Sequence, residues 1–201
     1  MSKITREQIV AASTAMIADE GAEAFSMRRL AERLGVTPMA LYHHVGNRER
    51  LLHAVLHEVS GRLERPELPA DPRERALAVA LSFHAFLRAN PWAIPLISVG
   101  RTDAQEGIWV SEQLVQAAVD AGVPDEAAFR FFRVVLAVVV GQVVAFPPGG
   151  DDAEDVELPP PDPSDEGPGL HRFLRRWSAY DRRLSVEALL RSVIDAQLPA
   201  L

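Results

Sequence analysis

The sequence contains no cysteine, and it has almost none of the polar and apolar alternation that marks half-buried β-strands. The absence of cysteine excludes disulfides and thiolate metal sites, and it is compatible with a reducing compartment. The sequence also lacks an HExxH spacing, a phosphate-binding loop and a nucleophile elbow. We therefore predict an all-α protein with no metal site, no cofactor and no enzymatic activity.

No segment has the features of a membrane anchor or a signal peptide. The longest apolar run covers residues 134–146, whereas a membrane-spanning helix needs about 20 residues. We expect this run to form a buried helix. Near the N-terminus, charged or polar residues separate Ile4 from Ile9 and Val10, unlike the continuous apolar stretch of a signal peptide. The expected location is the cytoplasm, with no membrane partner.

The negative charge of this protein is concentrated in one segment. The net charge is −7, yet residues 1–50 carry seven Lys or Arg against six acidic residues. Residues 147–169 carry eight acidic residues and no basic one, and they are rich in Pro and Gly. We predict that this segment is a disordered acidic linker, either a solvated connector or a lid over a ligand entry. The overall acidity therefore does not exclude a nucleic-acid partner for the N-terminal residues.

Residues 26–52 predict two short helices joined by a tight turn. Ser26 can cap the first helix through its hydroxyl, and an apolar stripe around Leu30 gives this helix a buried face. Gly35 suits the left-handed residue that ends a helix, and Thr37 offers the next cap only two residues later. A connection this short prevents an antiparallel arrangement. We expect the sharp crossing of a helix-turn-helix that binds DNA.

The second helix of the pair is predicted from Pro38 to about residue 44. Leu41 and Val45 lie four residues apart and can face inward together. Small, aromatic and imidazole side chains then face outward, which is unusual for a solvated surface and suits a DNA groove. These outward residues are Met39, Ala40, Tyr42, His43 and His44.

The segment LAERLGVTPMALYHHVGNRERLL resembles the DNA-binding motif of the tetracycline-repressor (TetR) family of bacterial transcription regulators. The preceding TREQIVAASTAMIADEGAEAFS extends the resemblance, which is continuous over residues 5–56, and NPWAIPLI and RRLSVEALLRSVI add to it more weakly. The resemblance implies a ligand-responsive homodimeric repressor with an N-terminal DNA-binding domain and a larger sensing domain. A small-molecule effector would release it from an inverted-repeat DNA operator.

DNA contacts are expected on and around the second helix of the motif. Apolar side chains there favour contacts with thymine methyl groups as part of the base readout. The predicted DNA-binding residues are Arg28, Thr37, Pro38, Met39, Ala40, Tyr42, His43, His44 and Arg48. At the N-terminus, Lys3, Thr5 and Arg6 are further candidates for a phosphate contact, with a solvated terminus as the open alternative.

Two other helices flank the pair. A capping box beginning at Thr5 starts the first one. From Asn47 a long helix is predicted to continue to about Arg65, where three prolines follow within seven residues. A rigid helix that contacts both domains can pass a ligand-driven shift to the DNA contacts. We therefore predict a DNA-binding domain at residues 1–47 and an effector-binding and dimerisation domain at 48–201.

The C-terminal part shows helical periodicity interrupted by Gly and Pro. The predicted helices cover residues 71–89, 91–99, 103–122, 124–146, 168–179 and 181–198. The family resemblance implies that helices 124–146 and 181–198 pair with their copies in a four-helix dimer interface. The same apolar residues could instead fill the core of a monomer.

The resemblance also implies an effector pocket inside the C-terminal domain, lined by apolar and aromatic side chains with a few polar anchors. A polar group on a buried helix needs a partner, and an effector can be that partner. The effector is predicted to be hydrophobic. The candidate pocket residues are Phe83, His84, Phe86, Trp92, Trp109, Gln113, Phe132 and Gln142.

His43 and His44 do not indicate a metal site, because adjacent residues on a helix point in different directions and cannot chelate one ion together. A helical binding or scaffold protein that acts without DNA is the alternative to a transcription regulator. Specific protection of a duplex containing an inverted repeat distinguishes the two.

Overall fold

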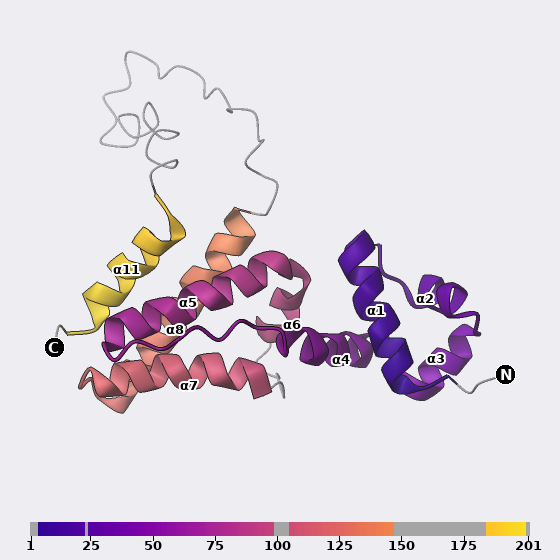
Figure 1. Cartoon of the computed structure of the whole chain (residues 1–201), viewed down its shortest axis with the longest axis horizontal. Coiled ribbons are helices and arrows are strands. Elements are labelled where there is room, and N and C mark those ends of the chain that lie inside the picture. Colours follow the sequence, from indigo (N-terminus) through magenta and orange to yellow (C-terminus); the bar gives the residue numbers. More distant parts are fainter. Residues whose placement is uncertain (1–3, 23, 99–104, 147–183, 200–201) are drawn as a thin grey trace, which may run out of the picture.

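All regular elements in the described part of the chain are helices. The computed structural model describes residues 4–22, 24–98, 105–146 and 184–199. Figure 1 shows an elongated molecule with α1 to α4 at one end and the other helices packed together at the opposite end. This arrangement confirms the predicted all-α fold with a small N-terminal helical unit and a larger helical unit. The predicted acidic linker, 147–169, and the predicted helix 168–179 lie outside the described residues.

Four helices form the N-terminal unit, and each begins at a side-chain cap. They are α1 (Arg6–Glu20), α2 (Met27–Leu34), α3 (Pro38–Val45) and α4 (Arg48–Ser60). Thr5 forms a reciprocal capping box with Gln8 at the start of α1. Ser26, Thr37 and Asn47 each accept a hydrogen bond from the backbone N–H three residues later. The predicted caps are confirmed, and each satisfies a donor that a helix start leaves unpaired.

The N-terminal helices enclose one apolar cluster. Leu30 of α2, Leu41 of α3 and Leu51 of α4 are completely buried, together with Ile9 of α1. Burying a leucine side chain stabilises a fold by about 1.5 to 3 kcal/mol. The predicted inward residues are therefore confirmed, although Leu34 is only partly buried at the edge of the cluster.

The helix that begins after Asn47 is shorter than predicted, because α4 ends at Ser60 rather than near Arg65. Gly61 follows the last turn, and glycine has a low helix propensity. Pro66 disfavours helical geometry at the residue before it, so the helix does not resume. The chain from Gly61 to the next helix is irregular, and its Leu63 packs against the C-terminal core.

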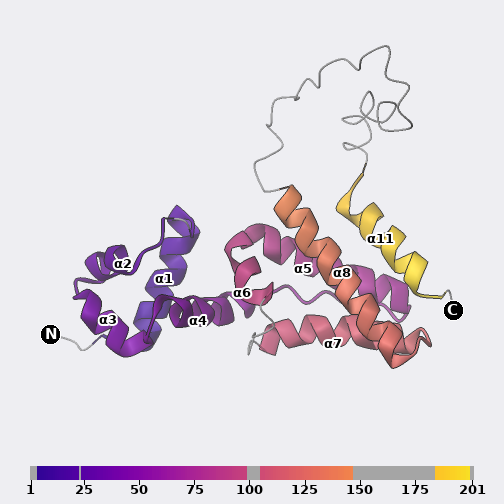
Figure 2. The ribbon, with the colours of Figure 1, turned by 180° about the vertical axis from the view of Figure 1, so that it is seen from behind.

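The C-terminal unit has its own apolar core. Its elements are α5 (Pro72–Ala89), a 3₁₀ turn η1 (Pro91–Ala93), α6 (Ile94–Ser98), α7 (Gln105–Asp120), α8 (Asp125–Ala145) and α11 (Val186–Gln197). The helix α5 contacts α7, α8 and α11, and it is therefore the central helix of this unit. Figure 2 shows α8 and α11 crossing the same side of α5.

The helix predicted at 91–99 is divided into η1 and α6. Pro91 starts the 3₁₀ turn, and Pro95 lies within the first turn of α6, where a missing backbone N–H is tolerated. Because Pro95 has no N–H, it cannot donate the hydrogen bond that would continue one α-helix from Pro91. The sequence correctly predicted helical structure in this segment. The division of the segment into η1 and α6 depends on Pro95.

The apolar helix α8 is less buried than predicted. Only one stripe, Val135, Val139 and Val143, is fully buried among the residues of the apolar run, whereas Val144 is 63% exposed. By length and composition alone α8 could cross a membrane, a test that core helices of soluble proteins also pass. Here α8 packs its buried stripe against α5, α7 and α11. The prediction of an entirely buried helix is wrong, because these neighbours cover only one side of it.

Candidate nucleic-acid interface and effector core

The turn between α2 and α3 contains three residues, and its geometry fixes how the two helices cross. Gly35 adopts the left-handed conformation, with φ of 65°, and its N–H and that of Val36 bond to carbonyls in the last turn of α2. This pairing satisfies carbonyls that a helix end leaves free. Thr37 then caps α3, whose first residue is Pro38. The result is the predicted helix-turn-helix.

The outer surface of α3 carries most of the residues predicted to contact DNA. Met39 is 77% exposed and Tyr42 is 42% exposed, which is unusual for large apolar side chains without a partner. Thr37, Pro38 and His43 are also exposed, whereas Ala40 and His44 are partly buried. These seven side chains therefore come from one short helix and its cap, opposite the buried Leu41 and Val45. Their contact with DNA stays a prediction.

The arginines of the N-terminal unit divide into two groups. On α2, Arg29 pairs with Glu20, and Arg33 lies 3.4 Å from Asp19. Both acceptors belong to α1, so these two cations hold α2 against α1. Arg28, predicted to contact DNA, pairs with Glu32 one turn along α2 at 3.0 Å. This pair is exposed, and exposed pairs of this kind contribute little, so Arg28 can exchange Glu32 for a phosphate.

The second group lies near the end of α3. Within the described residues, Arg6, Arg48 and Arg50 form no ion pair. Arg48 is exposed, and its guanidinium carbon lies 5.9 Å from the centre of the Phe25 ring. Uncompensated guanidinium groups beside an exposed helix are suited to bind phosphate. Arg48 and Arg50, both of which follow the Asn47 cap and are expected from the sequence to lie close to phosphates, therefore stay candidates, and Lys3 lies outside the described residues.

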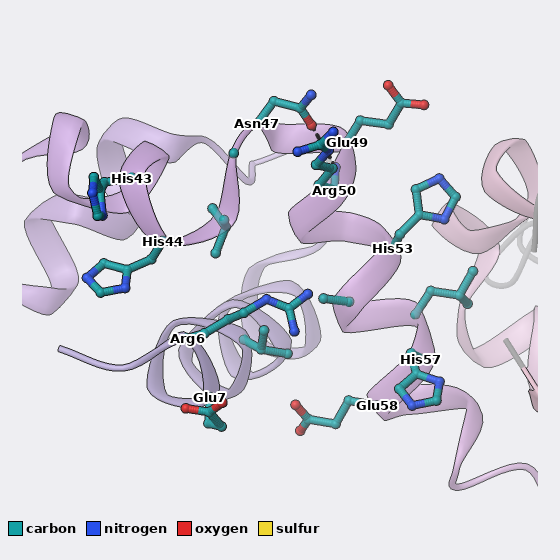
Figure 3. A pocket seen from close by; sticks show the side chains of 15 residues that line it. Arg6, Glu7, His43, His44, Asn47, Glu49, Arg50, His53, His57 and Glu58 are labelled. Carbon is teal, nitrogen blue, oxygen red and sulfur yellow. Dashed lines mark hydrogen bonds between the residues drawn. The ribbon is translucent and has the colours of Figure 1, made fainter. Parts of the chain in front are cut away.

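An open groove of about 1410 Å³ lies between the start of α1, the end of α3 and one face of α4 (Figure 3). Four histidines line it, of which His43 and His44 come from α3, and His53 and His57 come from α4. The α4 pair was not among the residues predicted from the sequence. Their spacing of four residues, which places both on one face of a helix, was the signal that could have found them. Arg6 extends from α1 toward the groove.

The candidate effector residues are spread over four elements of the C-terminal unit. His84 of α5 is buried, and Phe83 is buried beside it and stacks on Phe86 at 6.4 Å between ring centres. The other candidates, Phe86, Trp92, Trp109, Gln113, Phe132 and Gln142, are partly buried. Phe86 and Trp92 pack against both apolar cores, so they also lie at the junction of the two units.

Two of the aromatic candidates have neighbours that the sequence did not indicate. The guanidinium of Arg65, which precedes Pro66 in the irregular segment, lies 5.4 Å from the centre of the Trp109 ring. The Phe132 ring lies 6.3 Å from that of Phe129, which is 60% exposed. Phe132 therefore borders the exposed side of α8. Contact between these candidate residues and an effector stays a prediction.

Burial lowers the pKa of His84 below the usual value for histidine, and the nearby positive charge of Arg88 lowers it further. Both causes favour the uncharged imidazole, because a cation in this position loses hydration and is repelled by Arg88. A neutral imidazole can donate one hydrogen bond and accept another. His84 is therefore the candidate anchor best suited to an uncharged polar group on an apolar ligand.

Comparison with known proteins agrees with this geometry. Residues 9–55 match the N-terminal domain of the bacterial regulatory proteins of the tetR family, and residues 65–162 match the tetracyclin repressor-like C-terminal domain. An HTH-type transcriptional regulator of Saccharopolyspora erythraea is 28% identical over 71% of this chain. The match spans 61% of that relative, and the chain covers less than two thirds of several curated relatives.

Two solved structures are similar over most of their length. BioQ, solved with its double-stranded DNA operator, is 30% identical, with a TM-score of 0.63 over 71% of this chain and 87% of its own. The Streptomyces coelicolor TetR family protein ActR, solved with (S)-DNPA, is 26% identical, with a TM-score of 0.76 over 98% of each chain. With both domains matched, this chain belongs to the TetR family of bacterial regulatory proteins, which are DNA-binding transcriptional regulators rather than enzymes.

Proposed function

We propose that this protein is a ligand-responsive transcriptional repressor that binds an inverted-repeat operator as a homodimer and is released by a small molecule. The exposed face of α3 carries the proposal. Met39 and Tyr42 present apolar surface to solvent one turn apart on α3, and a partner that covers this surface gains the free energy of burying it. The DNA-bound structure of the similar BioQ supports a duplex as that partner.

Sequence reading is proposed to depend on the apolar part of α3. Met39 and Ala40 can contact thymine methyl groups in the major groove, and the hydroxyl of Tyr42 can bond to a base edge. Arg28 of α2 and Arg48 of α4, the helices that precede and follow α3 in the chain, supply exposed cations. Contacts to phosphates orient the protein, and contacts to bases select the sequence.

The exposed side of α8 and the start of the last described segment favour a second copy of the chain as partner. Among the described residues, the exposed large apolar side chains of these two segments are Phe129, Val144, Phe146 and Leu184. A homodimer would cover them, and it would place two α3 helices on successive major grooves, about 34 to 36 Å apart. A two-fold symmetric protein also matches an inverted repeat.

Sedimentation tests the dimer directly. We expect a species of about twice the 22.1 kDa chain mass at micromolar concentration. Val144→Asp places a charge on the exposed face of α8 and should give monomers that bind the operator weakly. Val119→Asp, which changes a 41% exposed valine on α7, is the matched control and should stay dimeric. A wild-type monomer at this concentration would contradict the proposal.

The effector is proposed to bind among the candidate residues of the C-terminal core. ActR has been solved with (S)-DNPA and with actinorhodin, which supports a small organic ligand for this protein as well. Phe86, Trp92 and Leu96 pack against both apolar cores, and Leu56 carries α4 into the C-terminal core. A ligand that displaces them would shift α4, and a coupling of about 1 to 3 kcal/mol is sufficient for induction.

We keep the division into a DNA-binding domain at 1–47 and a sensing and dimerisation domain at 48–201 as part of this proposal. Helix α4 contributes side chains to both cores, so it is the connection between the two functions. A cytoplasmic location, where operator DNA is accessible, follows from the proposed function.

Selection of bound duplexes from a random pool, with and without a panel of hydrophobic compounds, tests the whole proposal. We expect an enriched inverted repeat whose retention falls when an effector is present. Enrichment of no sequence would overturn the repressor proposal and favour a helical scaffold that acts without DNA. Thermal stabilisation by charged, sugar-like compounds alone would contradict a hydrophobic effector.

A further inference from the structure

Helix α11 is held on the C-terminal unit by its contacts rather than by a short connection. In the sequence, residues 147–183 lie between the end of α8 and the segment that contains α11. The helix has 12 residues, and an isolated helix shorter than about 12 to 15 residues is only marginally stable in water. The position of α11 therefore depends on the side chains that attach it to its neighbours.

The buried face of α11 is a single apolar stripe. Leu190, Ile194 and Leu198 are spaced four residues apart and are at most 2% exposed. They pack in the C-terminal core, where α11 contacts α5 and α8 (Figures 1 and 2). Apolar burial is not directional, and side chains one turn apart on a helix occupy similar positions. The stripe therefore favours docking of α11, but it does not by itself select one register along α5.

A cation from the first turn of α5 holds the C-terminal end of α11. The Arg73 guanidinium donates hydrogen bonds to the backbone carbonyls of Asp195 and Leu198, with 3.0 Å between Nε and the Leu198 oxygen. It also lies 3.4 Å from the Asp195 carboxylate. Helix ends leave carbonyls unpaired and carry partial negative charge, and α11 has no basic residue in its own last turn. Arg73 therefore supplies the cation that the sequence of α11 lacks there.

The next residue of α5 contacts α11 one turn closer to its start. Arg191 donates hydrogen bonds to both carboxylate oxygens of Glu74, and the distance from Nη2 to Oε2 is 3.2 Å. Glu187, a further turn back on α11, lies 3.5 Å from the same guanidinium. A bidentate pair of this kind has a defined planar geometry, so it specifies an orientation in addition to attracting the two helices.

These two contacts form what we call the α11 clasp. It consists of Arg73 and Glu74 of α5 with Arg191, Asp195 and Leu198 of α11. Because its two contacts lie one turn apart on α11, the clasp fixes both the register and the rotation of this helix on α5. The adjacent Arg75 has a different partner, since it pairs with Asp120 of α7.

We propose that the α11 clasp positions α11 for dimerisation, holding it in the register in which its outer side and that of α8 form one surface for a second copy of the chain. The inference rests on the proposed homodimer and assigns residues that act on the dimer surface through α11. Helices α8 and α11 cross the same side of α5 (Figure 2). A slip of α11 by one turn would displace its exposed side chains by about 5.4 Å relative to α8, and two copies would no longer fit together.

Sedimentation of the full chain over a range of concentrations tests the inference through the dimer dissociation constant. Arg73→Gln should weaken dimerisation about tenfold, because it removes hydrogen bonds from a charged donor to two carbonyls. Glu74→Gln and Arg191→Gln should each weaken it about threefold, because exposed ion pairs contribute less. The double variant of Glu74 and Arg191 should lose little more than either single variant, since each residue acts through the other.

Arg75→Gln is the matched control for a general loss of stability. Arg75 is the next arginine in the same turn of α5, but its ion pair holds α7 rather than α11. This variant should lower the melting temperature and leave the dimer dissociation constant unchanged. If Arg75→Gln weakened dimerisation as much as Arg73→Gln, overall stability rather than the position of α11 would control the dimer, and the inference would be overturned.

A chemical cross-link separates the position of α11 from the stability of the fold. The chain contains no cysteine, so Glu74→Cys with Arg191→Cys introduces its only two thiols. Without a cross-link this variant should dimerise weakly. A short bis-maleimide that joins α5 to α11 within one chain should restore the wild-type dissociation constant. Cross-links that form only between two chains would place α11 on a second copy and would overturn the clasp.

The outcomes distinguish this inference from the homodimer proposal. A wild-type monomer would contradict the homodimer and, with it, a role for the clasp. A wild-type dimer whose dissociation constant is unchanged in Arg73→Gln and Glu74→Gln would overturn the clasp and leave the homodimer standing. The same conclusion would follow if the variant cross-linked within one chain dimerised as weakly as before cross-linking.

Discussion

Replacing Arg48 by Gln should weaken DNA binding in a way that depends on salt. Arg48 is the first residue of α4, its side chain is exposed, and within the described residues it has no ion-pair partner. Its guanidinium can therefore bind a phosphate without first breaking an ion pair. Each phosphate that a protein neutralises releases counterions and contributes about 0.9 to the slope of log K against log salt.

The magnitude follows from that slope. Losing one phosphate contact should reduce the slope by about 0.9, which corresponds to about fivefold weaker binding at 0.15 M salt relative to a 1 M reference. Fluorescence anisotropy with the selected operator, measured from 0.05 to 0.3 M salt, gives both values. The position of Arg48 over Phe25 contributes about 0.5 to 1 kcal/mol to stability at an exposed site, so a thermal melt accompanies the binding curve.

Arg33→Gln is the matched comparison. Arg33 is also exposed and lies in the same unit, but it is paired with Asp19 and Glu20 of α1. Its loss should leave the salt slope unchanged and reduce stability by no more than about 1 kcal/mol. An unchanged slope for Arg48→Gln, or an equal loss of slope for Arg33→Gln, would refute the division of arginines into paired and available cations.

Three further predictions concern the core, the reading surface and an acid-sensitive contact. Leu41→Ala should lower the free energy of urea unfolding by about 2 to 5 kcal/mol, because Leu41 of α3 is completely buried in the apolar cluster of the N-terminal unit. Tyr42→Ala should weaken operator binding by about 1 to 3 kcal/mol and leave binding to random duplexes nearly unchanged, and equal losses on both would contradict base reading. The hydrogen bond from Arg191 lowers the pKa of Glu74 below the usual value for glutamate. The contact therefore stabilises the fold fully above that usual value, and the stabilisation is lost as the pH falls through the lowered pKa. Glu74→Gln should therefore flatten the acid side of the stability profile, and a parallel profile would show that the contact does not contribute.

The outline of the DNA-binding unit could be predicted because its signals are local. A cap such as Ser26 acts on a backbone N–H three residues away, and Gly35 ends α2 by its own conformation. Neither depends on distant parts of the chain. The end of α4 was predicted too late, because an apolar stripe indicates that a helix forms but does not indicate where it ends. Gly61 ends the helix here.

The exposure of α8 could not be read from its composition. An apolar run is compatible with burial on every side or on one side, and only the positions of α5, α7 and α11 decide which residues are covered. The same holds for the effector candidates. Sequence indicated that polar groups such as His84 and Gln142 lie among apolar ones, but it did not indicate that His84 is buried while Gln142 is only partly so.

Local signals along the chain were sufficient to predict the helix-turn-helix, its caps and the inward and outward faces of α3, because helix periodicity and capping act over three or four residues. Which cations are available depends on tertiary packing, because Arg33 contacts Asp19 only when α2 packs on α1. Tertiary packing also brings four histidines from two helices into one groove. Charge pairing and groove formation depend on contacts between distant segments, and residue spacing along a chain does not specify those contacts.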